Sequence, residues 1–168
     1  CVASGADDLE PPAELSATDG PIRCEFMARD ANLTLSELKY SPDGNVLCIA
    51  STDNSVYIYS VPAGYRLVGK FTKHTSPVLH GDIARDGSVM ETGSAANEAL
   101  VCTIPTARQV GGAAERDLAS QYQNWCSWTR PCGWPVRAVW GVPDCEVLSV
   151  DRSPLSSADH PAVLAASY

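Results

Sequence analysis

An internal repeat with a period of 43 residues constrains the fold more than any other feature of this sequence. Residues 41–69 align with residues 84–112 without a gap, and seven of the 29 positions are identical. The identical pairs fall at turns and at apolar positions: Asp43/Asp86, Gly44/Gly87, Val46/Val89, Ser51/Ser94, Asn54/Asn97, Pro62/Pro105 and Gly69/Gly112. A period of this length is typical of one supersecondary unit that stacks on its own copies.

The sequence of each copy predicts short strands joined by tight turns. In the first copy, strands are predicted over residues 35–40, 46–51, 56–61 and 65–71. The first turn is Pro42-Asp43-Gly44, in which Pro presets φ, Asp bonds nearby backbone and Gly accepts a positive φ. Residues 46–51 are almost entirely apolar, which indicates a strand that is buried on both faces. Four antiparallel strands in ~40–45 residues predict one blade of a β-propeller.

The repeat divides the sequence into five predicted parts. These are an acidic leader, linker or irregular edge (1–32), a blade (33–73), a degenerate blade (74–115), a Trp-rich insertion with connecting strands (116–143) and the first half of a further blade (144–168). The predicted fold class is all-β, a partial β-propeller that forms a fragment of a larger one. Because propellers close with ~4–8 blades, we expect the remaining strands to come from a continuation of the chain or from a neighbouring chain.

The charge distribution limits the classes of partner. The formal net charge is -8, and residues 1–30 hold seven acidic and two basic side chains. Non-specific binding to nucleic acid depends on Lys and Arg side chains that neutralise phosphates, so no nucleic-acid partner is expected. No apolar run approaches the ~18–20 residues that span a bilayer, so no membrane partner is expected either.

A local basic segment interrupts this acidity. No acidic residue lies between Asp53 and Asp82, whereas Arg66, Lys70 and Lys73 fall within that span. Two interpretations are open: a solvated loop with a basic bias, or a docking patch for an acidic partner. The three basic residues are therefore candidate partner-binding residues.

The sequence carries no signature of catalysis or of a bound cofactor. The seven cysteines include no Cys-x-x-Cys pair and no Cys/His spacing typical of zinc sites. The sequence also lacks phosphate loops, dinucleotide fingerprints and common hydrolase motifs. His80-Gly81-Asp82 offers an acid/base pair, and ordinary strand polarity at a blade edge is the competing interpretation. We predict a non-enzymatic protein with no catalytic residues, no cofactor and no metal.

Four tryptophans lie within 16 residues, at positions 125, 128, 134 and 140. One interpretation is core packing between blades. The other is an aromatic interface, because Trp is enriched at binding hot spots and inserted segments often carry contacts. Trp125, Trp128 and Trp134 are the candidate partner-binding residues of this group.

The repeat resembles WD-repeat sequence. Asp53 stands at the tight-turn position, Tyr59 stands where Trp is usual, and His74 stands where the blade-opening His is expected. The resemblance implies structural roles within blades for Asp43, Gly44, Ser51, Asp53, Tyr59, His74, Asp86, Gly87 and Ser94. The side-chain network of such blades is incomplete here, because the second copy has Ala96 at the Asp position and Cys102 at the Trp position.

A narrower resemblance covers roughly residues 33–168. Arg116-Asp117-Leu118, Trp125-Cys126, Gly133-Trp134 and Val139-Trp140 follow one another in an order that ordinary WD repeats lack. Together with the first blade, they resemble the carboxy-terminal propeller of the echinoderm microtubule-associated-protein-like family. Gly133-Trp134 departs from the Gly-Phe of that family.

The family resemblance implies a non-enzymatic scaffold that binds tubulin, microtubules or axonemal proteins. It also implies a location in the cytoplasm and cytoskeleton, with the axoneme of a cilium or flagellum as a further expectation. The alternative function is a generic WD-repeat adaptor in a ubiquitin-ligase or trafficking complex.

Overall fold

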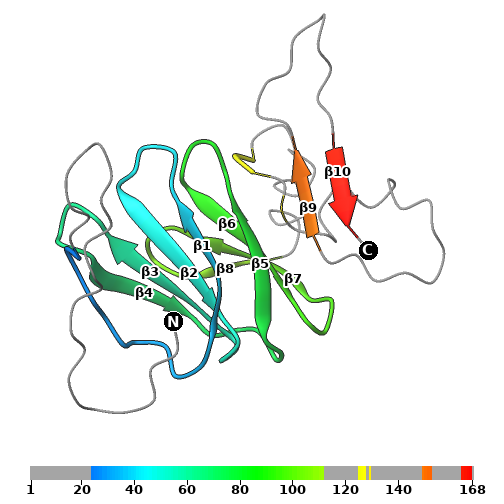
Figure 1. The fold of residues 1–168 in the computed structure, drawn as a ribbon, viewed down its shortest axis with the longest axis horizontal. Helices are drawn as coiled ribbons and strands as arrows, with labels where there is room; N and C mark the ends of the chain where they lie inside the picture. The colour runs from blue at the N-terminus through cyan, green and yellow to red at the C-terminus, as the bar shows by residue number, and fades with distance from the viewer. Residues whose placement is uncertain (1–23, 112–124, 128, 130–148, 153–163, 168) are drawn as a thin grey trace, which may run out of the picture.

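The computed structural model describes residues 24–111, 125–127, 129, 149–152 and 164–167. All regular secondary structure in these residues is β-strand (Figure 1). The strands are β1 (Leu35–Tyr40), β2 (Val46–Ser51), β3 (Ser55–Ser60), β4 (Arg66–Phe71), β5 (Val78–Ile83), β6 (Val89–Ser94), β7 (Ala99–Thr103), β8 (Gln109–Val110), β9 (Ser149–Arg152) and β10 (Leu164–Ser167). Within the described part of the chain, no helix is long and apolar enough to cross a membrane.

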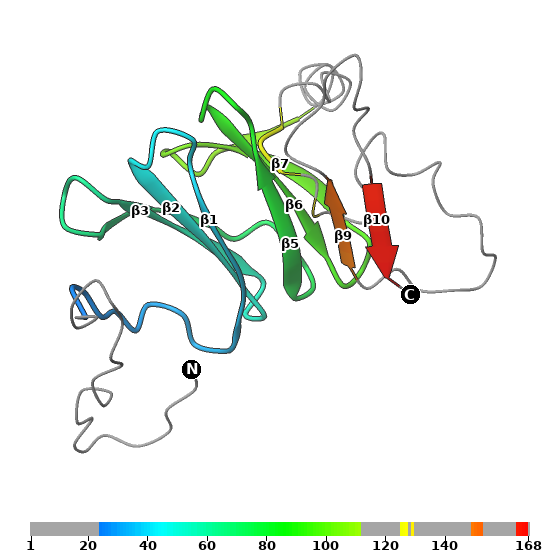
Figure 2. The ribbon, with the colours of Figure 1, turned by 45° about the horizontal axis from the view of Figure 1, so that its top comes forward.

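The first eight strands form two four-stranded antiparallel sheets with the orders β1-β2-β3-β4 and β5-β6-β7-β8. Each strand pairs with its neighbour in the sequence, as in a propeller blade. The two sheets lie side by side, and the antiparallel pair of β9 and β10 lies on the far side of β5–β8 (Figures 1 and 2). The prediction of an all-β, partial propeller is confirmed.

The 43-residue repeat is visible in the backbone conformation. Gly44 and Gly87 both have φ of 72°, and Asn54 and Asn97 have φ of 67° and 58°. Gly and Asn are the residues that adopt this left-handed conformation at least cost, which explains their identity in both copies. Tyr65, predicted to begin the fourth strand, also has a positive φ of 57°, and β4 therefore begins one residue later.

The two sheets share one hydrophobic core. Strand alternation places Cys48 and Ala50 of β2 on the face that looks towards β5–β8, together with side chains from both blades. The buried members are Cys48, Ala50, Val56, Ile58, Phe71, Val78, Ile83, Met90 and Cys102. The opposite face of β2 is covered as well. Because both faces of the strand are covered, its sequence is nearly continuously apolar.

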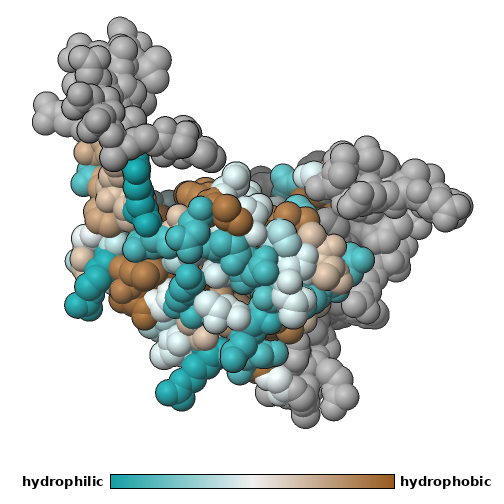
Figure 3. Space-filling model, turned by 90° about the horizontal axis from the view of Figure 1, so that it is seen from below, coloured by the Kyte–Doolittle hydropathy of each residue, from teal (hydrophilic) through white to brown (hydrophobic). Residues whose placement is uncertain are grey.

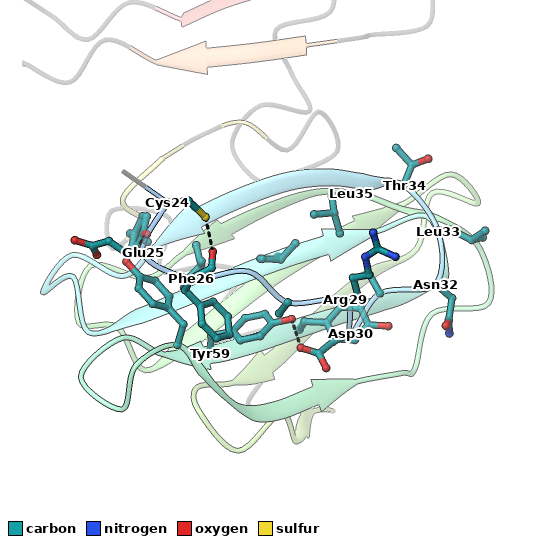
Figure 4. Close-up of a pocket in the computed structure, with 17 residues that line it drawn as sticks. Cys24, Glu25, Phe26, Arg29, Asp30, Asn32, Leu33, Thr34, Leu35 and Tyr59 are labelled. Carbon is teal, nitrogen blue, oxygen red and sulfur yellow. Dashed lines mark hydrogen bonds between the residues drawn. The ribbon is translucent and has the colours of Figure 1, made fainter. Parts of the chain in front are cut away.

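That opposite face of β1–β4 carries a second cluster, in which Leu47, Tyr57 and Tyr59 are buried. Residues 24–34 lie across this face and line a groove together with the sheet (Figure 4). Phe26 stacks on Tyr65 with ring centroids 5.6 Å apart. The described residues of the predicted leader or linker therefore pack against the first blade.

Candidate functional site

The two repeated turns are held by aspartate side chains. The Asp43 carboxylate accepts hydrogen bonds from the Ser41 hydroxyl and from Asn45, whose backbone N lies 3.1 Å and Nδ2 2.8 Å from it. Asp86 accepts from the backbone N of Ser88 at 3.0 Å and from its hydroxyl at 2.7 Å. The Ser41 and Asn45 hydrogen bonds lower the pKa of Asp43, and those from Ser88 lower the pKa of Asp86. Both carboxylates fix turn geometry.

A third carboxylate closes the turn between β2 and β3. Asp53 accepts from the Tyr57 hydroxyl at 2.6 Å and from the Asn32 backbone N at 3.1 Å. The Ser51 hydroxyl accepts from the Asp53 backbone N at 3.2 Å. Burial alone would raise the pKa of Asp53, but the hydrogen bonds from Tyr57 and Asn32 outweigh it and the pKa is lowered. Ser51 and Asp53 thus join the start of the blade to this turn.

In the second blade, the turn between β6 and β7 is linked to His74, which precedes β5 and is only 5% exposed. Its Nε2 lies 2.7 Å from the Thr92 hydroxyl, and its Nδ1 lies 3.1 Å from Glu98 Oε2. The Thr92 hydroxyl also donates to the Leu100 carbonyl at 3.2 Å. The Ser94 hydroxyl donates to the same Glu98 oxygen at 2.8 Å. His74 and Ser94 therefore both contact the carboxylate of Glu98.

Glu98 is the residue that sequence reasoning missed. The ungapped repeat places Ala96 opposite Asp53, so the second blade is expected to lack a carboxylate there. Glu98 follows Asn97, the left-handed residue of the turn, and its side chain is one methylene longer than that of Asp. It accepts from Thr75 as Asp53 accepts from Asn32, which stands 43 residues earlier. The sequence does contain a signal for this role, because a glutamate stands two residues after Ala96, the position where the aspartate is expected.

The substitution Glu98→Gln tests this role through pH. Hydrogen bonds from Thr75 and Ser94 hold the pKa of Glu98 at about 2, below the ordinary 4.5. Because the folded-state pKa is depressed, the stabilisation is present above pH 4.5 and is lost as pH falls towards about 2. The variant should have a lower Tm than the parent at neutral pH, and the difference should shrink near pH 2 in circular dichroism melts. An equal Tm difference at both pH values would contradict the assignment.

Tyr59 does not enter the turn network of its own blade. Its hydroxyl donates to Asp30 at 2.9 Å, and the side chain is 6% exposed (Figure 4). Burial, followed by the hydrogen bond to Asp30, raises the pKa of Tyr59. In place of the usual Trp, this residue ties residues 24–34 to the sheet.

The three candidate basic residues lie along the edge of the first blade. Arg66 and Lys70 stand near opposite ends of β4, Lys73 follows the strand, and all three are exposed. Lys70 Nζ lies 4.6 Å from the centroid of the Tyr57 ring, and the Tyr57 hydroxyl contributes most to raising the pKa of Lys70. Hydrophilic and hydrophobic residues are interspersed on the face of the molecule that Figure 3 shows.

Trp125 is 3% exposed, and its backbone pairs with Ala84 at the end of β5. Arg85 Nε donates to the Trp125 carbonyl at 3.3 Å, and the Cys126 backbone N donates to the Ile83 carbonyl at 2.8 Å. A buried side chain is unavailable to a partner, so the structure favours packing over an interface role for Trp125. Trp128 and Trp134 lie outside the described residues.

The residues after Trp125 complete a polar cluster that was not expected from the sequence. Asp82 is 4% exposed and accepts from the Ser127 hydroxyl and from the Thr129 backbone N and hydroxyl. The Thr129 hydroxyl also lies 3.0 Å from Glu37 Oε1, and Glu37 accepts from the Gly81 backbone N. Asp82 thus holds Ser127 and Thr129 against the second blade, and Glu37 connects Thr129 to the first.

Within the described ranges, no three His, Cys, Asp or Glu side chains are grouped so that they could hold a metal ion. Cys48 and Cys102 are buried in the shared core, and burial raises the pKa of each thiol to about 12. Both cysteines therefore behave as small apolar side chains.

No family model matches the chain. It is 37% identical over 107 residues to the 77 kDa echinoderm microtubule-associated protein of Strongylocentrotus purpuratus, covering 61% of this chain and 15% of that protein. It is 34% identical over 129 residues to human echinoderm microtubule-associated protein-like 2, covering 74% of this chain and 19% of that protein. The chain thus spans less than a fifth of the length of these relatives.

Among solved structures, the chain is similar to the RRP9 WD40 repeats, with a TM-score of 0.46 and 23% identity over 52% of this chain and 29% of that one. The similar proteins from Strongylocentrotus purpuratus, Lytechinus variegatus, human and mouse are all named echinoderm microtubule-associated protein or echinoderm microtubule-associated protein-like. The chain resembles the echinoderm microtubule-associated-protein-like family over 107–129 residues.

Proposed function

We propose that this chain is part of a non-enzymatic, microtubule-associated scaffold. The observation that carries the proposal is the similarity of 107–129 residues to proteins whose names describe association with microtubules. A propeller presents turns and strand edges to partners, and three turns here are held by hydrogen bonds to the carboxylates of Asp43, Asp53 and Asp86. Axonemal proteins and the cytoskeleton of a cilium or flagellum are narrower forms of the same proposal.

The outer strand β4 is the proposed contact with the acidic tubulin surface. Arg66, Lys70 and Lys73 are exposed there, in a stretch of sequence without acidic residues. The chain as a whole has a net charge of -8, so long-range attraction to tubulin is weak and a local patch must supply the complementarity. Contacts of this kind depend on ionic strength.

Reversing the three charges tests the patch. The variant Arg66→Glu/Lys70→Glu/Lys73→Glu should bind microtubules several-fold more weakly than the parent in co-sedimentation at low salt, because attraction becomes repulsion. The single variant Lys73→Glu should weaken pelleting to a smaller extent. Its control is Arg108→Glu, an exposed change of equal charge on the second blade, which should leave pelleting unchanged. Unaltered pelleting of the triple variant would remove the patch from the proposal.

The alternative, a WD-repeat adaptor in a ubiquitin-ligase or trafficking complex, predicts a different outcome. An affinity purification with the full chain should then recover such machinery and no tubulin. That result, together with no co-sedimentation of the parent chain, would contradict a microtubule-associated function.

A further inference from the structure

β4 is the outermost strand of the first blade, and one of its two edges is open. The sheet order β1-β2-β3-β4 ends at this strand (Figure 1). Among the described residues, no backbone hydrogen bond joins β4 to any element except β3. An open strand edge offers a row of unpaired N–H and C=O groups to an additional strand.

The second blade supports β4 from the side of the shared core. Gly69 lies so close to the turn between β7 and β8 that a Cβ atom added to it would stand 2.5 Å from the Pro105 carbonyl oxygen. Phe71, at the end of the strand, is 1% exposed and belongs to the shared core. The strand is thus held in place before a partner arrives, which lowers the entropic cost of pairing.

A bulge in β4 places its basic side chains on both faces of the sheet. The pairing with β3 shifts by one residue at Val68. Lys70 pairs with Tyr57, and Arg66 pairs with a residue three positions further along β3, Ser60. Side chains alternate between faces along a strand, so positions an odd number of residues apart lie on opposite faces. Arg66 and Lys70 therefore flank the open edge from opposite faces.

The exposed charges of this edge are all positive. Arg66, Lys70 and Lys73 are exposed, and none of them forms an ion pair with a described residue. Lys70 Nζ lies 4.6 Å from the centroid of the Tyr57 ring, a contact that leaves the ammonium charge unneutralised. Residues 54–81 include no Asp or Glu, so β3 and β4 carry no acidic side chain. Like charges repel across a strand pair and opposite charges attract, so this edge disfavours a second copy of itself and favours an acidic strand.

We propose that the open edge of β4 binds an extended, acidic peptide segment, which adds to the sheet as a further strand. Main-chain hydrogen bonds supply affinity in this mode of recognition, and the basic side chains select the partner. The proposal deepens the proposed contact between β4 and an acidic partner, and it rests on that proposed function for the protein that supplies the segment.

The positions of the basic residues also define which acidic sequence fits. The segment must present carboxylates on both of its faces, to Arg66 on one side and to Lys70 on the other. A run of consecutive acidic residues does this, because its side chains alternate between the faces. A strict alternation of acidic and neutral residues places every carboxylate on one face and leaves one of the two basic residues without a partner.

Fluorescence anisotropy with the full 168-residue chain and labelled octapeptides at low ionic strength tests the proposal. The peptide Thr-Thr-Glu-Glu-Glu-Glu-Thr-Thr should bind several-fold more tightly than Glu-Thr-Glu-Thr-Glu-Thr-Glu-Thr, which has the same composition and charge. N-methylation of the four central glutamates in the first peptide keeps its charge but removes backbone donors. It should therefore weaken binding several-fold.

Two charge-reversal variants locate the binding edge. Arg66→Glu/Lys70→Glu should lose the preference for the peptide with consecutive glutamates. The control Arg29→Glu/Arg108→Glu makes an equal change of charge at two exposed residues outside β4 and should keep the preference. The comparison of the three peptides uses the parent chain, so it does not depend on the folding of any variant.

Equal binding of the three peptides to the parent would overturn the proposal, because affinity would then follow charge alone. Failure of the parent to bind the peptide with consecutive glutamates would also overturn it. In that case, co-sedimentation with microtubules that depends on the basic residues of β4 would still support the proposed function. A retained peptide preference without any co-sedimentation of the parent would support strand addition and contradict the proposed function alone.

Discussion

Replacing Phe71 with Ala is expected to lower the free energy of unfolding by about 3–5 kcal/mol, the range for deleting a buried aromatic side chain. Phe71 ends β4, is 1% exposed and belongs to the core that both sheets share. Its ring also meets His74 edge-on, with centroids 5.8 Å apart. The variant therefore loses buried area and an aromatic contact, and leaves a cavity between the blades. Chemical denaturation followed by far-UV circular dichroism measures the loss.

Val68→Ala is the matched control for this substitution. Val68 lies on the same strand and is 37% exposed, so its truncation should cost less than about 1 kcal/mol. A cost below about 1 kcal/mol for Phe71→Ala as well would contradict the shared core. The contrast between two truncations on one strand separates core burial from strand propensity.

Replacing His74 with Ala is expected to cost about 2–4 kcal/mol, because it opens a cavity and removes one hydrogen-bond partner each from Thr92 and Glu98. Thr92 is fully buried and loses the imidazole that lies 2.7 Å from its hydroxyl. Glu98 loses one of its donors but keeps Thr75 and Ser94. Thermal and chemical unfolding of the purified chain measure the effect.

The neighbouring Lys73→Ala, at an exposed position, is the control and should change stability by less than about 0.5 kcal/mol. A double-mutant cycle with Thr92→Val sharpens the test. The His74→Ala and Thr92→Val effects should be non-additive by more than about 0.5 kcal/mol, because the two side chains contact one another. Additive effects, or a loss for His74→Ala no larger than the control, would contradict the network.

The turns and strands were accessible to sequence reasoning because their determinants are local. Gly44 and Gly87 mark a positive φ that few other residues adopt cheaply, and the alternation in β2 and β3 sets which side chains face inward. Such signals repeat at a fixed spacing and need no knowledge of distant contacts. The all-β propeller fold followed from them.

The side-chain networks were harder to predict from the sequence, because they depend on contacts between residues that are far apart in the chain. Glu98 occupies the place of an aspartate through one additional methylene, which an ungapped alignment does not register. The burial of Trp125 depends on backbone pairing with Ala84, 41 residues earlier. The cluster of Glu37, Asp82 and Thr129 joins three distant segments, so no spacing in the sequence predicts it.

Two copies of one blade fold as a unit through a shared core, and hydrogen exchange in Phe71→Ala tests this most directly. The variant should accelerate amide exchange in β6 and β7 of the second blade as strongly as in β2 and β3 of the first. Val68→Ala should leave both blades close to the parent. Faster exchange confined to the first blade, with β6 and β7 unchanged, would contradict the shared core.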